Sequence, residues 1–164
     1  MEALEAKAPT YQLASWGRRI LSAVIDLLVI SFITTPFTRT ALQHVLDSYN
    51  ARQAIGGHDL RTLALAQLAV QVTYMTAFHG WRGSTIGKMA ARTVLVRDDG
   101  TKVTVAVAFV RSVTFAVIYF VSQFVFAPII VDELRPLWSP RRQTWHDVVA
   151  RTIVVRADPR NLTE

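Results

Sequence analysis

The chain has 164 residues, of which 51% are hydrophobic, and its mean hydropathy is positive, at +0.28. This composition predicts one small membrane domain, and the absence of cysteine excludes disulfides, thiolate nucleophiles and cysteine-based metal sites. The net charge of +6 is compatible with nucleic acid binding, but in a membrane protein it indicates contact with anionic lipid headgroups. We therefore expect the lipid bilayer, and no nucleic acid, as the partner.

Residues 1–13 are polar and contain Pro9, so we expect a disordered cytoplasmic N-terminus. The first predicted span, residues 16–37, is apolar almost throughout, and a helix of about 22 residues rises roughly 33 Å, enough to cross the hydrocarbon core. Asp26 lies near its middle. Because an ionisable side chain inside a membrane needs partners, we expect Arg19, Ser22 and Asp26 to form a polar stripe that faces the bundle interior. Asp26 then either holds helices together or handles an ion or proton.

Pro36 is predicted to end this first span, since proline removes a backbone donor from a helix. Residues 38–61 should form a polar connection outside the membrane, with a short helix at about 40–53. His44 and His58 lie in this connection, and two single histidines are more typical of solvated side chains than of metal ligands. We predict no metal site.

The second predicted span covers residues 60–79. It contains glutamine and threonine side chains that must face other helices rather than lipid: Gln67, Gln71, Thr73 and Thr76. These polar positions predict a packed bundle rather than a pair of isolated membrane anchors.

An internal repeat follows the second span. Residues 85–96 read TIGKMAARTVLV, and residues 144–155 read TWHDVVARTIVV, at a fixed offset of 59. A weaker similarity joins the segments after Arg18 and Arg111. The pattern indicates an ancestral duplication, with chance similarity between Ala/Val/Thr-rich segments as the alternative. Each copy predicts a short helix capped by its threonine and then a strand, and the two strands could pair if both copies lie on one side of the membrane.

The third apolar region, residues 104–131, is too long for one ideal crossing and short for two. A single tilted span would put the arginine-rich C-terminal segment outside the cell. A helical hairpin or re-entrant pair, broken near residues 122–128 and extending to 138, keeps every basic segment inside, which the positive-inside rule favours. The choice leaves three or four crossings open.

These elements together predict an all-α membrane protein. We expect a small bundle of three to four transmembrane or re-entrant helices with a small cytoplasmic β-hairpin or sheet. The membrane domain should cover residues 14–156, and residues 157–164 should form a C-terminal tail.

Several of these features occur together in one known family. They are Arg19 and Asp26, the TIGK segment at 85–88, Arg111 at the start of the third apolar region, and the QTWHD segment at 143–147. Over residues 14–156 the chain resembles the RDD family of small bacterial integral membrane proteins, although Trp145 replaces the usual leucine. The resemblance implies a multi-pass protein of the bacterial cytoplasmic (inner) membrane with a cytoplasmic N-terminus.

The resemblance also maps the arginine and two aspartates of the family name onto Arg19, Asp26 and Asp147. We expect these three charges to form one network, with Ser22, Lys88, Arg111 and His146 as supporting residues. Asp147 could instead be only a structural helix cap, because it falls in the first turn of a helix. Lys88 occupies the repeat position of Asp147, so a Lys88–Asp147 pair is a further hypothesis. His146 could titrate near neutral pH, but we expect it to be structural.

The sequence leaves two functions open. No nucleophile–base pair, metal cluster or cofactor motif is found, so we predict neither an enzyme nor a cofactor. The family is described as transport-related, which implies a carrier, as a homo-oligomer, that exchanges a cation for protons through the buried Arg/Asp network. The alternative is a non-catalytic accessory or assembly subunit of a larger membrane complex.

Overall fold

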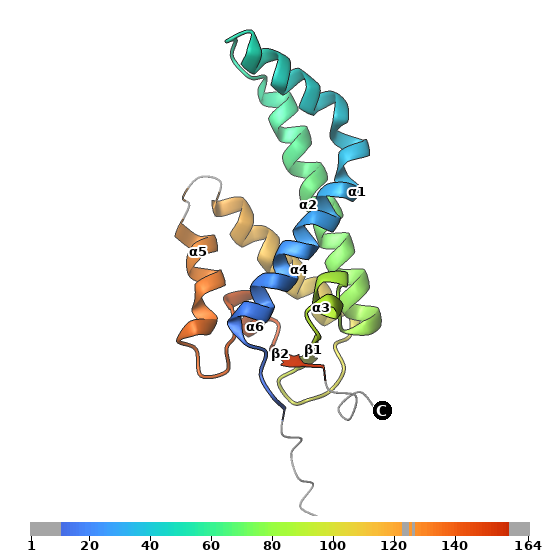
Figure 1. Cartoon of the computed structure of the whole chain (residues 1–164), viewed down its shortest axis with the longest axis vertical. Coiled ribbons are helices and arrows are strands. Elements are labelled where there is room, and N and C mark those ends of the chain that lie inside the picture. The colour runs from blue at the N-terminus through green and yellow to red at the C-terminus, as the bar shows by residue number, and fades with distance from the viewer. Residues whose placement is uncertain (1–10, 123–124, 126, 158–164) are drawn as a thin grey trace, which may run out of the picture.

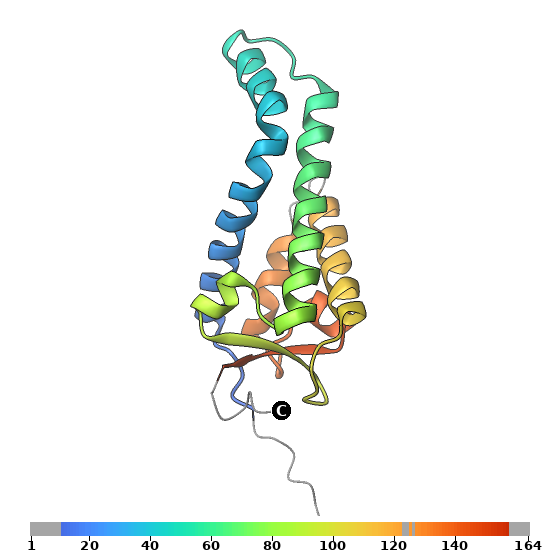
Figure 2. The same cartoon turned by 90° about the vertical axis from the view of Figure 1, so that its right-hand side faces the viewer.

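The structure is a computed structural model, and it describes residues 11–122, 125 and 127–157. Figure 1 and Figure 2 show two long helices running side by side, a shorter helical hairpin beside them, and a small sheet at one end. The elements in chain order are α1 (Trp16–Asn50), α2 (Gly57–Arg82), α3 (Ile86–Ala90), β1 (Thr93–Arg97), α4 (Val105–Ser122), α5 (Ala127–Leu134), the 3-10 turn η1 (Arg135–Leu137), α6 (Trp145–Val149) and β2 (Thr152–Arg156).

Helix α1 continues through Pro36 to Asn50, so the prediction that Pro36 ends the helix is wrong. Proline removes one backbone donor, but the segment after it is rich in residues that favour helix, and the helical path resumes. Two threonine hydroxyls beside it also bond to helix carbonyls: Thr35 donates to Ser31 and Thr38 donates to Thr34. The connection to α2 is therefore reduced to residues 51–56.

Two helices of the described residues, α1 and α4, are long and apolar enough to cross a membrane. Only 22% of the apolar stretch of each is buried inside the protein, and large side chains such as Phe32 and Phe37 on α1 and Phe109 on α4 point outward. Such continuous apolar surface fits lipid rather than water. The first and third predicted spans thus have the character of membrane helices, whereas α2, which covers the second, is more polar.

The third apolar region forms two helices and not one, which is the arrangement that the positive-inside rule favours. Helix α4 ends at Ser122, and α5 begins at Ala127 and returns toward the sheet (Figure 1). The Ser122 hydroxyl accepts a hydrogen bond from the Ile129 backbone N–H at 3.0 Å, which joins the two arms. Helix α5 has eight residues and rises only about 12 Å, so it cannot cross a bilayer alone.

Strands β1 and β2, one from each repeat copy, form a two-stranded antiparallel sheet. Leu95 lies opposite Val154, the residue 59 positions later, so the sheet has an approximate two-fold axis through its centre. Because the strands pair directly, both copies lie on one side of the bundle, as the sequence analysis required.

The two repeat copies also share their local hydrogen bonds. Thr85 accepts a bond from the Lys88 N–H, and Thr144 accepts one from the Asp147 N–H. Arg92 and Arg151 both adopt positive φ, at 53° and 50°. Ser84 and Gln143 donate to the carbonyls of Thr93 and Thr152, both at 2.8 Å. Chance similarity of composition would not reproduce these details, so they support duplication.

Residues 11–13 are ordered, although we expected them to belong to the disordered N-terminus. Leu13 forms a bridge with Val155, and the Gln12 carbonyl accepts a hydrogen bond from the Arg156 N–H at 2.8 Å. The rest of the predicted disordered N-terminus lies outside the described residues, as does the tail beyond residue 157.

The register of the sheet can be tested with a cysteine pair, since the chain has no cysteine. Leu95 and Val154 direct their backbone groups away from each other, to Gly83 and Ala14, and so form a non-hydrogen-bonded pair. The Cα atoms of such pairs lie about 4.5 Å apart, within disulfide range. We expect L95C/V154C to form a disulfide, measured by gel mobility without reductant and by loss of thiol labelling. L95C/V155C, whose side chains point to opposite faces, should remain reduced; the reverse result would refute this register.

Candidate functional site

Asp26 is buried at the junction of α1, α2 and α3, with 2% of its surface exposed. Its Oδ1 accepts hydrogen bonds from the Tyr74 hydroxyl at 2.7 Å and the Gly87 backbone N–H at 2.8 Å, and its Oδ2 accepts one from the Thr85 hydroxyl at 2.6 Å. Both carboxylate oxygens are therefore used. Asp26 fastens the first repeat copy to the long helical hairpin.

Gly87 allows α3 to approach α1 closely enough for this contact. A Cβ atom at position 87 would lie 2.1 Å from the Ser22 carbonyl oxygen and 2.7 Å from the Asp26 carboxyl carbon. No other residue type fits without moving α3 away from α1.

Asp147, at the start of α6, is fully buried and joins α1 to α4. Its Oδ2 accepts a hydrogen bond from Arg19 Nη1 at 2.8 Å, and its Oδ1 accepts one from Arg111 Nε at 2.9 Å. Arg111 Nη2 lies 2.9 Å from the same Oδ1 and completes the ion pair. Burial alone raises the pKa of the Asp147 carboxyl, but the positive charges of Arg111 and Arg19 outweigh it and hold the pKa well below its usual range. Asp147 also completes a capping box with Thr144, so the cap and the ion-pair roles coexist.

Asp132 on α5 fastens the second repeat copy, much as Asp26 fastens the first. It is fully buried and accepts a hydrogen bond from the Trp145 N–H, while its other oxygen lies 2.7 Å from His146 Nδ1. The rings of His146 and Phe115 pack in a T-shaped arrangement, with a centroid distance of 5.2 Å. This position agrees with a structural His146.

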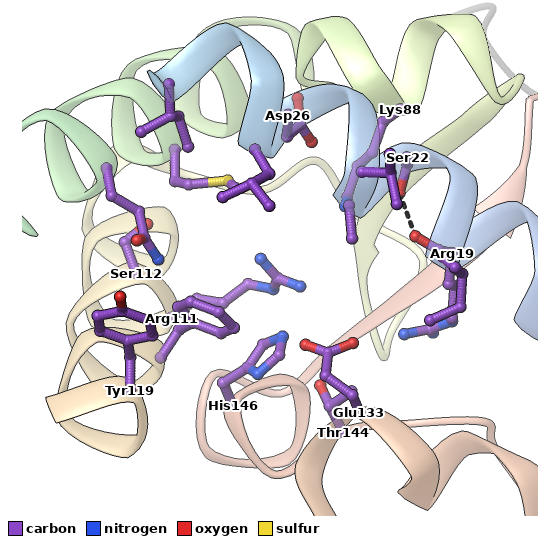
Figure 3. Close-up of a pocket in the computed structure, with 18 of the residues that line it drawn as sticks. Arg19, Ser22, Asp26, Lys88, Arg111, Ser112, Tyr119, Glu133, Thr144 and His146 are labelled. Atoms are coloured by element: carbon purple, nitrogen blue, oxygen red, sulfur yellow. Dashed lines mark hydrogen bonds between the residues drawn. The ribbon is translucent and has the colours of Figure 1, made fainter. Parts of the chain in front are cut away.

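A cavity of about 350 Å³ lies between these anchored elements (Figure 3). Apolar residues from four helices form much of its wall, and three basic residues, Arg19, Lys88 and Arg111, enter it beside the acidic Asp26 and Glu133. Figure 3 shows the Arg111 guanidinium and the Glu133 carboxylate pointing into the space. Its other polar lining comes from Ser22, Gln67, Gln71, Ser112, Tyr119, Thr144 and His146.

Two of the basic residues have unused donors. Nε and Nη2 of Arg19 are buried without a hydrogen-bond partner, and the Lys88 ammonium makes no hydrogen bond or ion pair with any residue that the structure describes. Lys88 is 8% exposed. Burial, and next the Arg111 charge, lower its pKa from 10.5 to about 8.

Six of the seven residues singled out from the sequence line this cavity, namely Arg19, Ser22, Asp26, Lys88, Arg111 and His146, and the seventh, Asp147, lies behind Arg19 and Arg111. Two expected pairs are not formed. Arg19 turns toward Asp147 rather than Asp26, because seven residues are about 10 Å along a helix axis. Asp147 is taken by the two arginines, so no Lys88–Asp147 ion pair forms.

The residues that complete these contacts could not be identified from the sequence. Tyr74 is one of the three Phe, Tyr or Trp residues on α2, and nothing in the sequence distinguishes it from the others. Asp132 and Glu133 directly follow the third apolar region, and their position there gives no sign of a buried role. The QTWHD segment shows that His146 and Asp147 are neighbours in the sequence, but it does not indicate that Asp132 contacts His146.

The close approach of α3 to α1 predicts the effect of enlarging Gly87. We expect Gly87→Ala to destabilise the protein by about 3 kcal/mol or more, because the new methyl group overlaps the Ser22 carbonyl. Thermal unfolding of the detergent-purified protein, followed by tryptophan fluorescence, measures it. Gly17→Ala is the control, since a Cβ there meets nothing within 4 Å. Equal unfolding temperatures for the two variants would contradict the contact.

The Asp147 ion pairs predict a larger loss. Asp147→Asn leaves two buried guanidinium groups without their counter-charge, and we expect it to cost about 3–5 kcal/mol. Asp99→Asn, in an exposed turn, is the control.

The same ion pairs predict how stability depends on pH. Because the folded-state pKa of Asp147 is depressed, its contribution to the stability of the protein is complete above the unfolded pKa of about 3.9 and is lost only as the pH falls below that value. Unfolding temperatures at pH 3 to 7 should show this acid-side loss for the wild type and not for Asp147→Asn.

The sequence model of one family matches the chain over residues 13–151, which include both anchored repeat helices and all seven singled-out residues. No curated protein and no solved structure among those compared matches it. The match covers most of the chain, and the two apolar helices agree with a membrane protein. The chain belongs to the RDD family.

Proposed function

We propose that this chain is a transport-related membrane protein without catalytic activity, and that the cavity between its helices is the solute site. The observation that carries the proposal is the cavity itself, about 350 Å³ in volume and lined by charged side chains, of which Lys88 and Glu133 form no ion pair with the residues that the structure describes. Charged groups without partners inside a protein are costly, and a solute that pairs with them offsets that cost.

Cation/proton exchange through the Arg/Asp network is the mechanism that the family resemblance suggests. Direct exchange at Asp26 would require this carboxylate to release three donors from Tyr74, Thr85 and Gly87. That release would also detach α3 from the long hairpin. We therefore assign Asp26 an architectural role, and place proton exchange, if it accompanies transport, at the ionisable groups of the cavity wall.

A variant that fills the cavity tests this proposal. Met75 lines the cavity from α2, and its replacement by tryptophan adds bulk there, whereas Leu65→Trp adds the same side chain to an exposed position of the same helix. Both variants and the wild type are placed in proteoliposomes that contain a pH-sensitive dye and receive pulses of Na⁺, K⁺, acetate or phosphate.

We expect at least one solute to move protons in the wild type and in Leu65→Trp, and a loss of at least tenfold in rate in Met75→Trp. The unfolding temperature of each variant shows that the fold is intact. Equal rates in Met75→Trp and Leu65→Trp would exclude the cavity as the path. No flux above empty liposomes for any of these solutes would contradict a carrier of this kind.

The accessory-subunit alternative is favoured by one observation. Asp26, Asp132 and Asp147 all hold elements of the fold together, which an architectural protein needs as much as a carrier does. The native mass of the protein, extracted from its own membrane in a mild detergent, distinguishes these functions. An unrelated subunit at fixed stoichiometry would support the accessory role, and a single chain or homo-oligomer would oppose it.

A further inference from the structure

We propose that the two repeat helices, α3 and α6, lie in the headgroup layer at one surface of the membrane and bind anionic lipids there. This inference concerns the outer surface of the bundle beside the sheet, and it does not depend on the function proposed for the cavity. Three observations carry it: the exposed apolar faces of α3 and α6, the position of every tryptophan, and the exposed arginine that follows each helix.

Helices α3 and α6 have the same unusual polarity, with polar side chains buried and apolar side chains exposed. Lys88 and Asp147 occupy equivalent positions on the buried faces. On the exposed faces the same two repeat positions are apolar, and each residue is between 38% and 43% exposed: Ile86 and Met89 on α3, and Trp145 and Val148 on α6. A helix of five residues cannot span a bilayer, so these faces fit a position along its surface.

All four tryptophans of the chain lie near the sheet. Each is between 37% and 74% exposed: Trp16, Trp81, Trp138 and Trp145. Each also lies at most five residues along the chain from a residue that hydrogen-bonds to the sheet, namely Ala14, Gly83 or Gln143. Tryptophan is enriched where a membrane meets water, because its ring is apolar and its N–H group can bond to headgroups. The four side chains therefore indicate that one boundary of the membrane lies at the sheet end.

The lengths of the apolar helices agree with a boundary at this level. Helices α1 and α4 both begin beside the sheet (Figure 2). A helix rises about 32 Å from Trp16 to Phe37, and the 18 residues of α4 rise about 27 Å. Both values are close to the thickness of the hydrocarbon core, about 30 Å. The exposed faces of α3 and α6 thus lie at the edge of the surface that faces lipid, which favours lipid over a protein as their partner.

The charges beside these faces select anionic lipids. Arg92 and Arg151, at equivalent repeat positions, are exposed and follow the ends of α3 and α6 by two residues. Among the described residues from 80 to 157, the exposed charged side chains are mostly basic: Arg82, Arg92, Lys102, Arg141, Arg142, Arg151 and Arg156, against Asp98 and Asp99. Basic side chains next to an exposed apolar face are typical of helices that bind anionic membrane surfaces.

The depth of the two helices can be measured with spin labels, because the chain has no cysteine. Met89→Cys and Val148→Cys carry the label on α3 and α6, with Leu28→Cys on the exposed side of α1 and Asp99→Cys in the exposed turn as references. The full chain is placed in vesicles of phosphatidylethanolamine and phosphatidylglycerol. Accessibility of each label to oxygen and to a water-soluble nickel complex gives its depth.

We expect the labels at 89 and 148 to lie at similar depths, within about 10 Å of the lipid phosphates, between the Leu28 label in the hydrocarbon and the Asp99 label in water. A label at 89 or 148 that is as accessible to nickel as the Asp99 label would overturn the inference. So would a label shielded from both reagents, which would indicate a protein partner or a second copy of the chain.

The unmodified chain provides an independent measurement through its tryptophans. Lipids brominated near the headgroup should quench the tryptophan fluorescence more strongly than lipids brominated near the chain ends, since all four tryptophans are expected at the interface. Stronger quenching by the deep bromines would contradict the proposed boundary.

Lipid selectivity tests the role of the arginines. We expect brominated phosphatidylglycerol to bind around the wild type roughly twofold or more tightly than brominated phosphatidylcholine, as judged by tryptophan quenching. Arg92→Gln/Arg151→Gln should lose this preference, whereas Arg39→Gln/Arg52→Gln, which removes two exposed arginines from the far part of the long hairpin, should keep it. Equal binding of the two lipids by the wild type, or equal losses in the two double variants, would overturn the inference.

Discussion

The structure depends on one buried carboxylate, Asp147, held between the guanidinium groups of Arg19 and Arg111. The three residues come from α6, α1 and α4, and the latter two are the helices apolar enough to cross a membrane. Apolar surfaces give little preference for one helix partner over another inside lipid, because the lipid tails are equally apolar. A charge that must be neutralised has few acceptable partners, so this cluster fixes how α1 and α4 are placed relative to α6.

The two repeat copies use the same scaffold for different charges. Both present a threonine cap, a five-residue helix, an arginine at positive φ and a strand, and a distant aspartate docks each helix through its first backbone amides. At equivalent positions, however, one copy carries Asp147 and the other carries Lys88. Asp147 forms ion pairs with two arginines, whereas Lys88 forms none with the residues that the structure describes. The duplication supplies the symmetry of the framework, and this substitution makes the charges around the cavity between the copies asymmetric.

Local patterns in the sequence were enough to predict much of this fold. The repeat offset predicted the caps and the paired strands, because both are determined by a few adjacent residues. The break between α4 and α5 followed from the distribution of arginines. Helix α1 was misjudged, because the weight of one proline against the helix-forming residues around it depends on the rest of the molecule. The partners of Asp26 could not be predicted, since Tyr74 and Gly87 lie 48 and 61 residues away and nothing local points to them.

The contrast between Asp26 and Lys88 bears on what the family residues do. Buried charges persist in a fold when the gain from their partners matches the cost of removing water from them. Asp26 meets this condition with three donors inside the chain, so the fold alone explains its burial. Lys88 lies close by, and its ammonium group makes no hydrogen bond or ion pair with the residues that the structure describes. The contacts of the fold therefore explain the burial of Asp26 and leave the burial of Lys88 unexplained, so the two charges of this region need not serve the same purpose.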